Sequence, residues 1–407
     1  MLYLKLGLRN ILKNFRKNLL TISMISFGMI ALFVYGGSNT QMFGQFRDMV
    51  VHEQYGHFQL HAKGYSEFGK KKPFDYLITN ASEIERQLLA EGSVNFVAPR
   101  LHFSGIASSD TRSAVIQGFG GDAAAEGRME YRKVNAGEFI GNTDKACAVI
   151  GELASRKLST SIGSTITVLA NMKGGGISAV DLTITGTKKS SGESDIQNQM
   201  FILADLASVQ ELIDAPDSVD TIIVHLKDGQ SFKKAERQIV EFCKANNLEY
   251  ETWNDLAVFY ERSRQVFSMN EKMLTTIILI ISVFIIVNTL YMSYMSRVRE
   301  IGTMRAIGTT KKQVLELFIS ESIILALSGC LLGIIVASLI AGIINGLGGI
   351  YHPSSVFNED PYYTLIKPEF TMILLYCLLF TAVSIAASVV ISFRALKLSI
   401  ANSLRRN

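Results

Sequence analysis

The sequence predicts an integral membrane protein in which four transmembrane α-helices carry one large α/β domain outside the cytoplasm. Three observations support this class. Four stretches are apolar over roughly the 20 residues that a helix needs to cross a bilayer. The polar stretch between the first two is long enough to form a domain of its own. Lysine and arginine are concentrated on one side of the four stretches.

The composition agrees with a chain that lies partly in lipid. Hydrophobic residues make up 48% of the 407 residues and charged residues only 19%. The net charge of +4 does not suggest a nucleic-acid partner. The four cysteines show no C-x-x-C spacing, so neither a zinc site nor a redox motif is indicated. A disulfide between Cys147 and Cys243 is left open.

The elements follow in chain order. Residues 1–18 combine regularly spaced apolar residues with lysine and arginine, which predicts an amphipathic helix along the cytoplasmic face of the membrane. Transmembrane helices are expected at residues 19–37, 273–296, 317–347 and 369–393. The alternative for 19–37 is a cleaved signal peptide, but its basic region is long and its apolar core outlasts the usual length.

The distribution of basic residues fixes the expected topology. Lysine and arginine precede residue 19, recur in the connection 297–316 and return in the tail 394–407, whereas residues 348–366 contain none. The positive-inside rule places both termini and 297–316 in the cytoplasm. Segments 38–272 and 348–368 then lie on the outer side of a cell inner membrane, in the periplasm.

The segment 38–272 is predicted to be an α/β domain. Turn signals rich in glycine separate short β-type runs from two amphipathic helical patterns. The strands are expected at 58–61, 94–99, 113–117, 148–150, 165–169, 182–186 and 221–226, and the helices at 82–89 and 232–245. Residues 41–53 and 256–273 are expected to extend the first two transmembrane helices outward as stalks.

Motifs for chemistry in this domain are weak. Residues 64–71 nearly match a phosphate-binding loop, but Lys71 stands where the motif needs Ser or Thr for Mg²⁺. His57 and His61 have the spacing of helical metal ligands, yet the residues around them alternate as in a strand. A strand edge with solvated histidines is therefore favoured over a metal site, and no catalytic residues, bound cofactor or metal are predicted for this chain.

Small residues in the third apolar stretch predict a close contact between helices. Gly329, Gly333, Ala337 and Ala341 are four residues apart, a spacing that lets two helix backbones approach. Asn288, near the inner end of the second stretch, is expected to hydrogen-bond between helices, because a lone amide in lipid is costly.

The connection after the second stretch carries the most specific motif. Asn288-Thr289-Leu290 is followed by R-V-R-E-I-G-T-M-R-A-I-G at 297–308, and this pattern resembles the signature of FtsX-like, MacB-type ABC transporter permeases. The order of one span, a large outer domain and three further spans also resembles that family. Ser296 departs from it where Glu is usual, and no proline precedes the final Leu404-Arg405.

The resemblance implies a coupling segment that contacts a separate cytoplasmic ATPase, which would bind ATP and Mg²⁺ while this chain is not itself an enzyme. The implied coupling residues are Arg297, Arg299, Glu300, Ile301, Gly302, Arg305, Ala306, Ile307, Gly308 and Thr309. It further implies pairing with a second permease copy or a paralogue. The outer domain would have a porter-like lobe with a second lobe inserted at about 138–213.

Three functions remain as expectations. The first is a permease that releases lipoproteins or other envelope lipids, since residues 55–65 resemble Lol-type subunits. The second is MacB-like efflux of small molecules or peptides. The third is a signalling scaffold that binds an envelope partner. Membrane lipids, a lipoprotein substrate and a periplasmic partner are the further partners considered.

Overall fold

The computed structural model describes residues 15–69, 71–129, 134–140, 146–188, 200–296, 303–305, 307–353 and 362–396. The chain forms two compact units. The membrane unit comprises Met1–Gly44, Ser263–His352 and Tyr363–Asn407, and the α/β domain comprises Gln45–Arg262 and Pro353–Tyr362. Most of the predicted amphipathic segment and the end of the tail lie outside the described residues.

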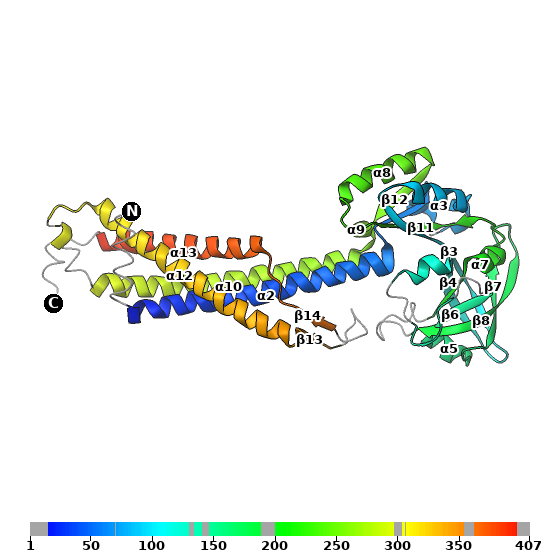
Figure 1. Ribbon diagram of the computed structural model, residues 1–407, viewed down its shortest axis with the longest axis horizontal. Helices are drawn as coiled ribbons and strands as arrows, with labels where there is room; N and C mark the ends of the chain where they lie inside the picture. The colour runs from blue at the N-terminus through cyan, green and yellow to red at the C-terminus, as the bar shows by residue number, and fades with distance from the viewer. Residues whose placement is uncertain are drawn as a thin grey trace. The chain divides into compact units, whose positions relative to one another are not determined.

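Four long helices make up the membrane unit and confirm the predicted spans (Figure 1). They are α2 (Phe15–Met49), α10 (Val258–Ser296), α12 (Lys311–Gly346) and α13 (Phe370–Leu396). Each contains an apolar window long enough to cross a membrane. Between α12 and α13, β13 (Ile350–His352) pairs with β14 (Tyr362–Thr364).

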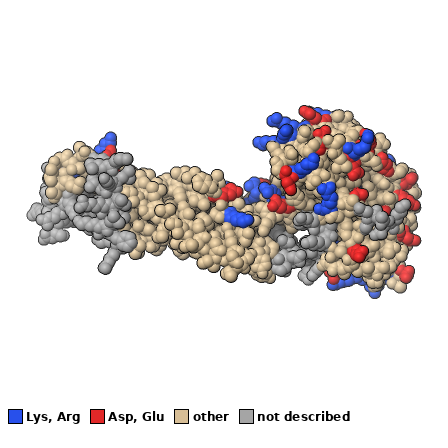
Figure 2. Space-filling view, viewed as in Figure 1, with Lys and Arg blue, Asp and Glu red and all other residues tan. Residues whose placement is uncertain are grey.

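Charge separates the two units clearly. Figure 2 shows lysine, arginine, aspartate and glutamate gathered over the α/β domain, whereas the helices present a surface that is almost free of charge. Large apolar side chains such as Phe284 and Leu339 are exposed on this surface. Exposure of so many apolar side chains is expected where lipid or another protein covers them in place of water.

One part of the α/β domain is a four-stranded antiparallel sheet covered by two helices. Its strands are β1 (Phe58–Ala62), β3 (Val94–Ser108), β11 (Thr221–Leu226) and β12 (Leu248–Thr252), in the order β12-β1-β11-β3. Helices α3 (Ala81–Ala90) and α8 (Phe232–Ala245) complete a βαββαβ unit. Both helices pack on one face, where Leu88 and Ile239 join Phe58 in a common core. We call this part the sheet lobe.

The other part is a small closed barrel inserted between β3 and β11. Its strands are β4 (Ser113–Gly121), β6 (Cys147–Gly151), β7 (Thr165–Asn171), β8 (Ile177–Lys188), β9 (Phe201–Asp205) and the far end of β3. The pairings run β3-β4-β9-β6-β8-β7 and return to β3, so the ring closes. Ile166, Leu182 and Ile202 fill its interior with α7 (Leu206–Ile213). Each such buried side chain contributes roughly 1.5–3 kcal/mol.

The inserted lobe was expected at about 138–213. The buried residues of the barrel core extend further along the chain, from Leu101 to Ala215. The long strand β3 explains this, since its first half belongs to the sheet lobe and its second half to the barrel. Gly105 lies in the second half, where an added side chain would collide with the Leu169 carbonyl oxygen of β7.

All strands and both helices expected from the sequence are present, although β3 ends nine residues later and β8 begins five residues earlier than expected, and β9, β12, α5 and α7 were not predicted. The shorter elements are β2 (Ile78–Thr79), β5 (Ala136–Gly137), β10 (Ser218–Val219), α4 (Ala123–Gly127), α5 (Glu152–Leu158), α9 (Trp253–Leu256), η1 (Val50–Tyr55), η2 (Tyr65–Gly69) and η3 (Pro73–Tyr76). Cys147 and Cys243 are free thiols in separate cores, so the disulfide left open by the sequence does not form.

Candidate functional site

The small residues predicted on α12 lie against α2. A Cβ added to Gly329 would be 2.7 Å from Cβ of Ile25, and one added to Gly333 would be 2.7 Å from Cβ of Met29. These distances are shorter than any van der Waals contact, so only glycine allows the two helices to approach this closely. We call this contact the α2–α12 seam.

The seam continues along α12 and contains a polar contact. The Ser26 hydroxyl of α2 donates a hydrogen bond of 2.8 Å to the Gly329 carbonyl oxygen. Further along the helix, Ala337 is fully buried and Ala341 nearly so, and both pack in a cluster with Phe33. The structure therefore brings four of the predicted helix-packing residues together on one face of α12.

Asn288 is the exception among the helix-packing residues. It is exposed on α10, so it does not form the expected contact between helices within the single chain. Its neighbour Thr289 is the residue that turns inward and is 8% exposed. The sequence indicated that an amide in lipid needs a partner, but it could not determine toward which side of α10 the amide points.

The connection between α10 and α12 ends in a defined helix cap. Thr309 N–H donates to the Met304 carbonyl at 3.0 Å, and Gly308 N–H donates to the Arg305 carbonyl at 3.2 Å. Gly308 has φ of +106°, as a Schellman cap requires, and confirms that this position uses backbone angles that other residues avoid. Thr310 and Gln313 then form a capping box that starts α12.

The exposed side chains of this connection suit contact with a partner. Ile307 is 82% exposed and Met304 is 37% exposed, although both are apolar, and both lie within the motif at 297–308. Six of the predicted coupling residues lie outside the described residues, namely Arg297, Arg299, Glu300, Ile301, Gly302 and Ala306. Contact with an ATPase stays a prediction for all ten positions.

Glu271 of α10 forms a polar clamp that sequence analysis missed. Its carboxylate accepts a 2.7 Å hydrogen bond from the Tyr376 hydroxyl of α13 and a 3.3 Å bond from the Asn39 amide of α2. One carboxylate thereby ties three helices of the membrane unit. The sequence did contain a signal for this contact, because Glu271 lies at the boundary of an apolar stretch and ionisable residues in such places need partners.

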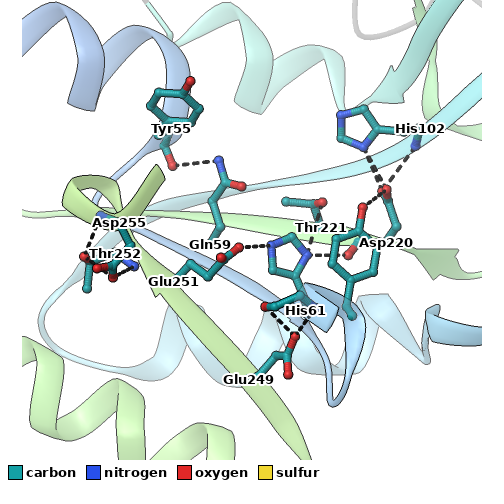
Figure 3. Close-up of polar contacts among 12 residues, drawn as sticks. Tyr55, Gln59, His61, His102, Asp220, Thr221, Glu249, Glu251, Thr252 and Asp255 are labelled. Carbon is teal, nitrogen blue, oxygen red and sulfur yellow. Dashed lines mark hydrogen bonds and ion pairs between the residues drawn. The ribbon is translucent and has the colours of Figure 1, made fainter. Parts of the chain in front are cut away.

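Polar side chains of the sheet lobe converge on Asp220, just before β11 (Figure 3). Its carboxylate accepts from His102 Nδ1 at 2.8 Å and from the Tyr65 hydroxyl at 3.1 Å. Burial raises the pKa of Asp220, but His102 and these hydrogen bonds outweigh burial, and the net pKa is lowered. The carboxylate therefore stays ionised and holds η2 and β3 against β11.

His61 shows that the expectation of solvated histidines at a strand edge was wrong. Strand β1 lies between β11 and β12, and His61 is buried. Its ring stacks on Tyr65 with centroids 4.3 Å apart, and its Nδ1 contacts the Asp220 carbonyl oxygen at 2.9 Å. Burial lowers the pKa of His61. In the described part of the chain, no three His, Cys, Asp or Glu side chains are arranged so that they could hold a metal ion.

The near match to a phosphate-binding loop is already occupied by a carboxylate. The backbone N–H groups of Gly64 and Ser66 donate to Glu249 of β12 at 2.8 and 2.6 Å. These are the amides that would cradle a phosphate. Burial raises the pKa of Glu249, but the hydrogen bonds from Ser66 and Gly64 lower it overall. The loop is therefore a structural link between η2 and β12.

Four spanning helices with a large α/β domain between the first two define the class of a transporter permease. Two family models divide the chain between them. The MacB-like periplasmic core domain matches residues 18–242, and the FtsX-like permease C-terminal domain matches residues 272–400. The chain therefore belongs to the MacB/FtsX-type ABC transporter permease family.

Similar proteins include two exporters and one solved domain. The pyoverdine export ATP-binding/permease protein PvdT of Pseudomonas fluorescens Pf-5 is 24% identical over 220 residues, which cover 52% of this chain and 33% of that protein. The macrolide export ATP-binding/permease protein MacB of Escherichia coli is 24% identical over 180 residues, which cover 43% and 28%. The periplasmic region of MacB from Actinobacillus actinomycetemcomitans is 15% identical, with a TM-score of 0.40, 50% of this chain covered and 92% of that one. The matched regions thus span about a third of the curated relatives.

Proposed function

We propose that this chain is the permease subunit of an ABC transporter in a cell inner membrane. A separate cytoplasmic ATPase binds ATP and Mg²⁺, and its movement passes through residues 297–310 to α12. The observation that carries this proposal is the connection itself, in which a Schellman cap at Gly308 leads directly into a capping box at Thr310. Because this short connection is held by backbone hydrogen bonds, a displacement applied to it moves α12 and does not simply bend the connection.

The α2–α12 seam supports the next step of this mechanism. Because α12 packs so closely on α2 that even an added Cβ at Gly333 would lie 2.7 Å from Cβ of Met29, α12 cannot slide past α2 without breaking the seam. Helix α2 is continuous in sequence with η1 and the first strand of the sheet lobe. A displacement of α12 is therefore passed to the helix that leads into the α/β domain.

A second permease copy or a paralogue completes the proposed assembly. Among the four described helices, α10 has the smallest part of its apolar window covered by the others. Asn288 is exposed on this helix. An amide facing a second protein can be hydrogen-bonded, whereas in lipid it could not, which supports α10 as a side of the dimer contact.

For the cargo, we propose a lipoprotein or another envelope lipid, for which the resemblance of residues 55–65 to Lol-type subunits is the support. Export of a small molecule is the second candidate, and it is favoured by the names of the relatives, which are exporters of pyoverdine and of macrolides. A signalling scaffold is the third candidate, and no contact in the described residues favours it.

The coupling proposal is tested by charge reversal at the connection. We expect the double variant Glu300→Arg with Arg305→Glu, and separately Ala306→Asp, to insert normally but to lose the ATPase in pull-downs or its stimulated ATP turnover in nanodiscs. The reason is that charge-assisted contacts are lost or reversed at the partner surface. Normal binding and normal turnover in both variants would contradict the proposal.

The cargo is tested by purification from native membranes followed by mass spectrometry of bound lipids and proteins. Enrichment of acylated proteins over a matched sample of the Ala306→Asp variant supports lipoprotein release. Enrichment of a small molecule with no acylated protein would refute lipoprotein release and support export instead.

A further inference from the structure

Three histidines of the α/β domain form a cluster that the proposed function does not use. His52 lies on η1, His57 directly precedes β1, and His225 lies on β11. Their ring centroids are 5.5 Å apart for His52 and His57, 6.2 Å for His52 and His225, and 5.9 Å for His57 and His225. The cluster therefore sits where the chain leaves η1 and enters the sheet.

His57 is held in one protonation state by its hydrogen bond. The Leu226 N–H donates to His57 Nδ1 at 3.2 Å, so this nitrogen must be unprotonated. An imidazolium ring carries a hydrogen on both nitrogens. Protonation would therefore place two donors against each other and break the bond between His57 and β11. Gly56, with φ of +69°, packs closely on β11, since a side chain there would collide with Ile223.

His225 is buried in a place that disfavours a charge. Its side chain stacks on Phe96 with centroids 4.3 Å apart, and its Nε2 has no hydrogen-bond partner among the described residues. A register shift in the pairing of β11 with β3 occurs between His225 and Leu226, and such irregularities re-aim side chains. His225 is 2% exposed, so a proton on it would be neither solvated nor paired.

The charged groups that face the cluster add to this effect. Arg100 of β3 and Arg128, which follows α4, both disfavour a positive charge on His225, and Arg128 lies 4.1 Å from the ring centroid of Phe96. Asp228 is the acidic group that acts on His57 in the opposite direction. Arg100 is itself paired with the buried Glu126 carboxylate at 2.6 Å, so Arg128 is the cation near His225 that no carboxylate in the described residues is shown to pair with, and burial is the main effect on both rings.

We propose that His57 and His225, with the ring of His52 packed against them, form a proton-sensitive joint, in which the neutral imidazoles of His57 and His225 hold the start of β1 against β11 and protonation of these two rings releases it. The joint acts in the compartment that the α/β domain faces, and acidification of that compartment is the signal. This inference does not depend on the ATPase or on the cargo, so it stands or fails separately from the proposed function.

The pKa values give the direction of the response. Burial, followed by His52, lowers the pKa of His57 to about 4, and burial, followed by His57 and His52, lowers the pKa of His225 to about 3. In the open joint both rings regain the ordinary value near 6.5. The closed joint is therefore fully stable above pH 6.5 and loses stability as the pH falls toward 4. Between pH 7 and pH 5 the open fraction rises by roughly 20-fold for each histidine.

The test is hydrogen exchange of the full chain in nanodiscs, read by mass spectrometry at pH 7.5 and 5.0 and corrected for the intrinsic exchange rate. Wild-type segments 50–60 and 222–228 should lose protection by roughly 20-fold or more at pH 5.0. In the variant His57→Gln with His225→Phe, an amide oxygen still accepts from Leu226 and a flat ring still stacks on Phe96, so the pH step should disappear. His352→Gln is the control and should keep the wild-type step.

Two results would overturn the joint. One is equal wild-type protection of both segments at the two pH values. The other is an unchanged pH step in the double variant. If the double variant does not fold, NMR titration of the six histidine rings in the wild type decides, because titration of the rings assigned to His57 and His225 near pH 6.5 in the closed state contradicts the proposal.

Discussion

Single side chains, and in two places the absence of one, control how the membrane helices meet. At Gly329 and Gly333 the missing Cβ permits the α2–α12 seam, and Ser26 adds a hydrogen bond within it. At Glu271 a carboxylate joins three helices. These contacts are made in or near lipid, where apolar burial does not drive association between helices. Close packing and hydrogen bonding therefore carry more of the stability there.

Gly333→Ala should destabilise the membrane unit, because the new Cβ would lie 2.7 Å from Cβ of Met29. We expect a loss of about 1–3 kcal/mol, as for other overpacked sites. The measurement is thermal unfolding in detergent. Gly342→Ala on the same helix is the control, since no described atom lies within 4 Å of the added Cβ. Equal stability of the two variants would mean that the seam is looser than described.

Tyr376→Phe should weaken the clamp at Glu271, because it removes the hydroxyl that donates at 2.7 Å. We expect a cost of roughly 1–3 kcal/mol, the usual range for a bond to a carboxylate. A double-mutant cycle with Glu271→Gln measures the pairwise part. Tyr351→Phe, on an exposed tyrosine, serves as the control. A coupling energy near zero would show that the two side chains do not act together.

At the scale of elements, the corner between α10 and α12 matters most. Its described part contains helical residues at 303–305, a left-handed glycine at 308 and the capped start of α12. The glycine and the cap fix the direction in which the chain enters α12. The proposed transmission of movement needs such a defined entry into the helix.

Gly308→Ala should impair stimulated ATP turnover, because alanine resists the left-handed angle and shifts the corner. The folding cost should be about 1 kcal/mol. Gly163→Ala is a matched control, since Gly163 also has a positive φ and open space around it but lies in the barrel. We expect both variants to lose a similar amount of stability, and only Gly308→Ala to lose stimulated ATP turnover. Loss of turnover in both variants would assign the effect to general instability.

At the scale of the whole molecule, the membrane topology determines on which side of the membrane each proposed partner would bind. In the proposed assembly the ATPase binds at the connection that contains Ile307, and the cargo or envelope partner binds at the α/β domain on the other side of the membrane. The uncharged surface of the helices in Figure 2 agrees with a bilayer around the membrane unit. The positive-inside rule assigns the sides.

Cysteine labelling tests this assignment in a variant without the native cysteines. A cysteine at Ser161, which is exposed in the α/β domain, should react with a membrane-impermeant thiol reagent in intact spheroplasts. A cysteine at Ile307 should react only after the membrane is opened, although its side chain is 82% exposed in the chain. The reverse pattern would contradict both the topology and the proposed function.

The sequence by itself determined the four apolar helices, their expected orientation and most of the strands of the α/β domain. These depend on local properties, namely apolar length, charge at helix ends and strand periodicity. The spacing of small residues on α12 also pointed to a close helix contact, although not to α2 as the partner.

Only the tertiary structure decided which residues meet across long distances in the chain. The closure of the barrel through β7 and β3, the clamp of Glu271 with Tyr376, and the gathering of His52, His57 and His225 all join residues far apart in sequence. The outward direction of Asn288 belongs here too, because the face that a helix buries depends on which neighbours it packs against. The local pattern of a helix or strand reflects residues that are adjacent in the sequence. It therefore does not specify which distant element the helix or strand packs against.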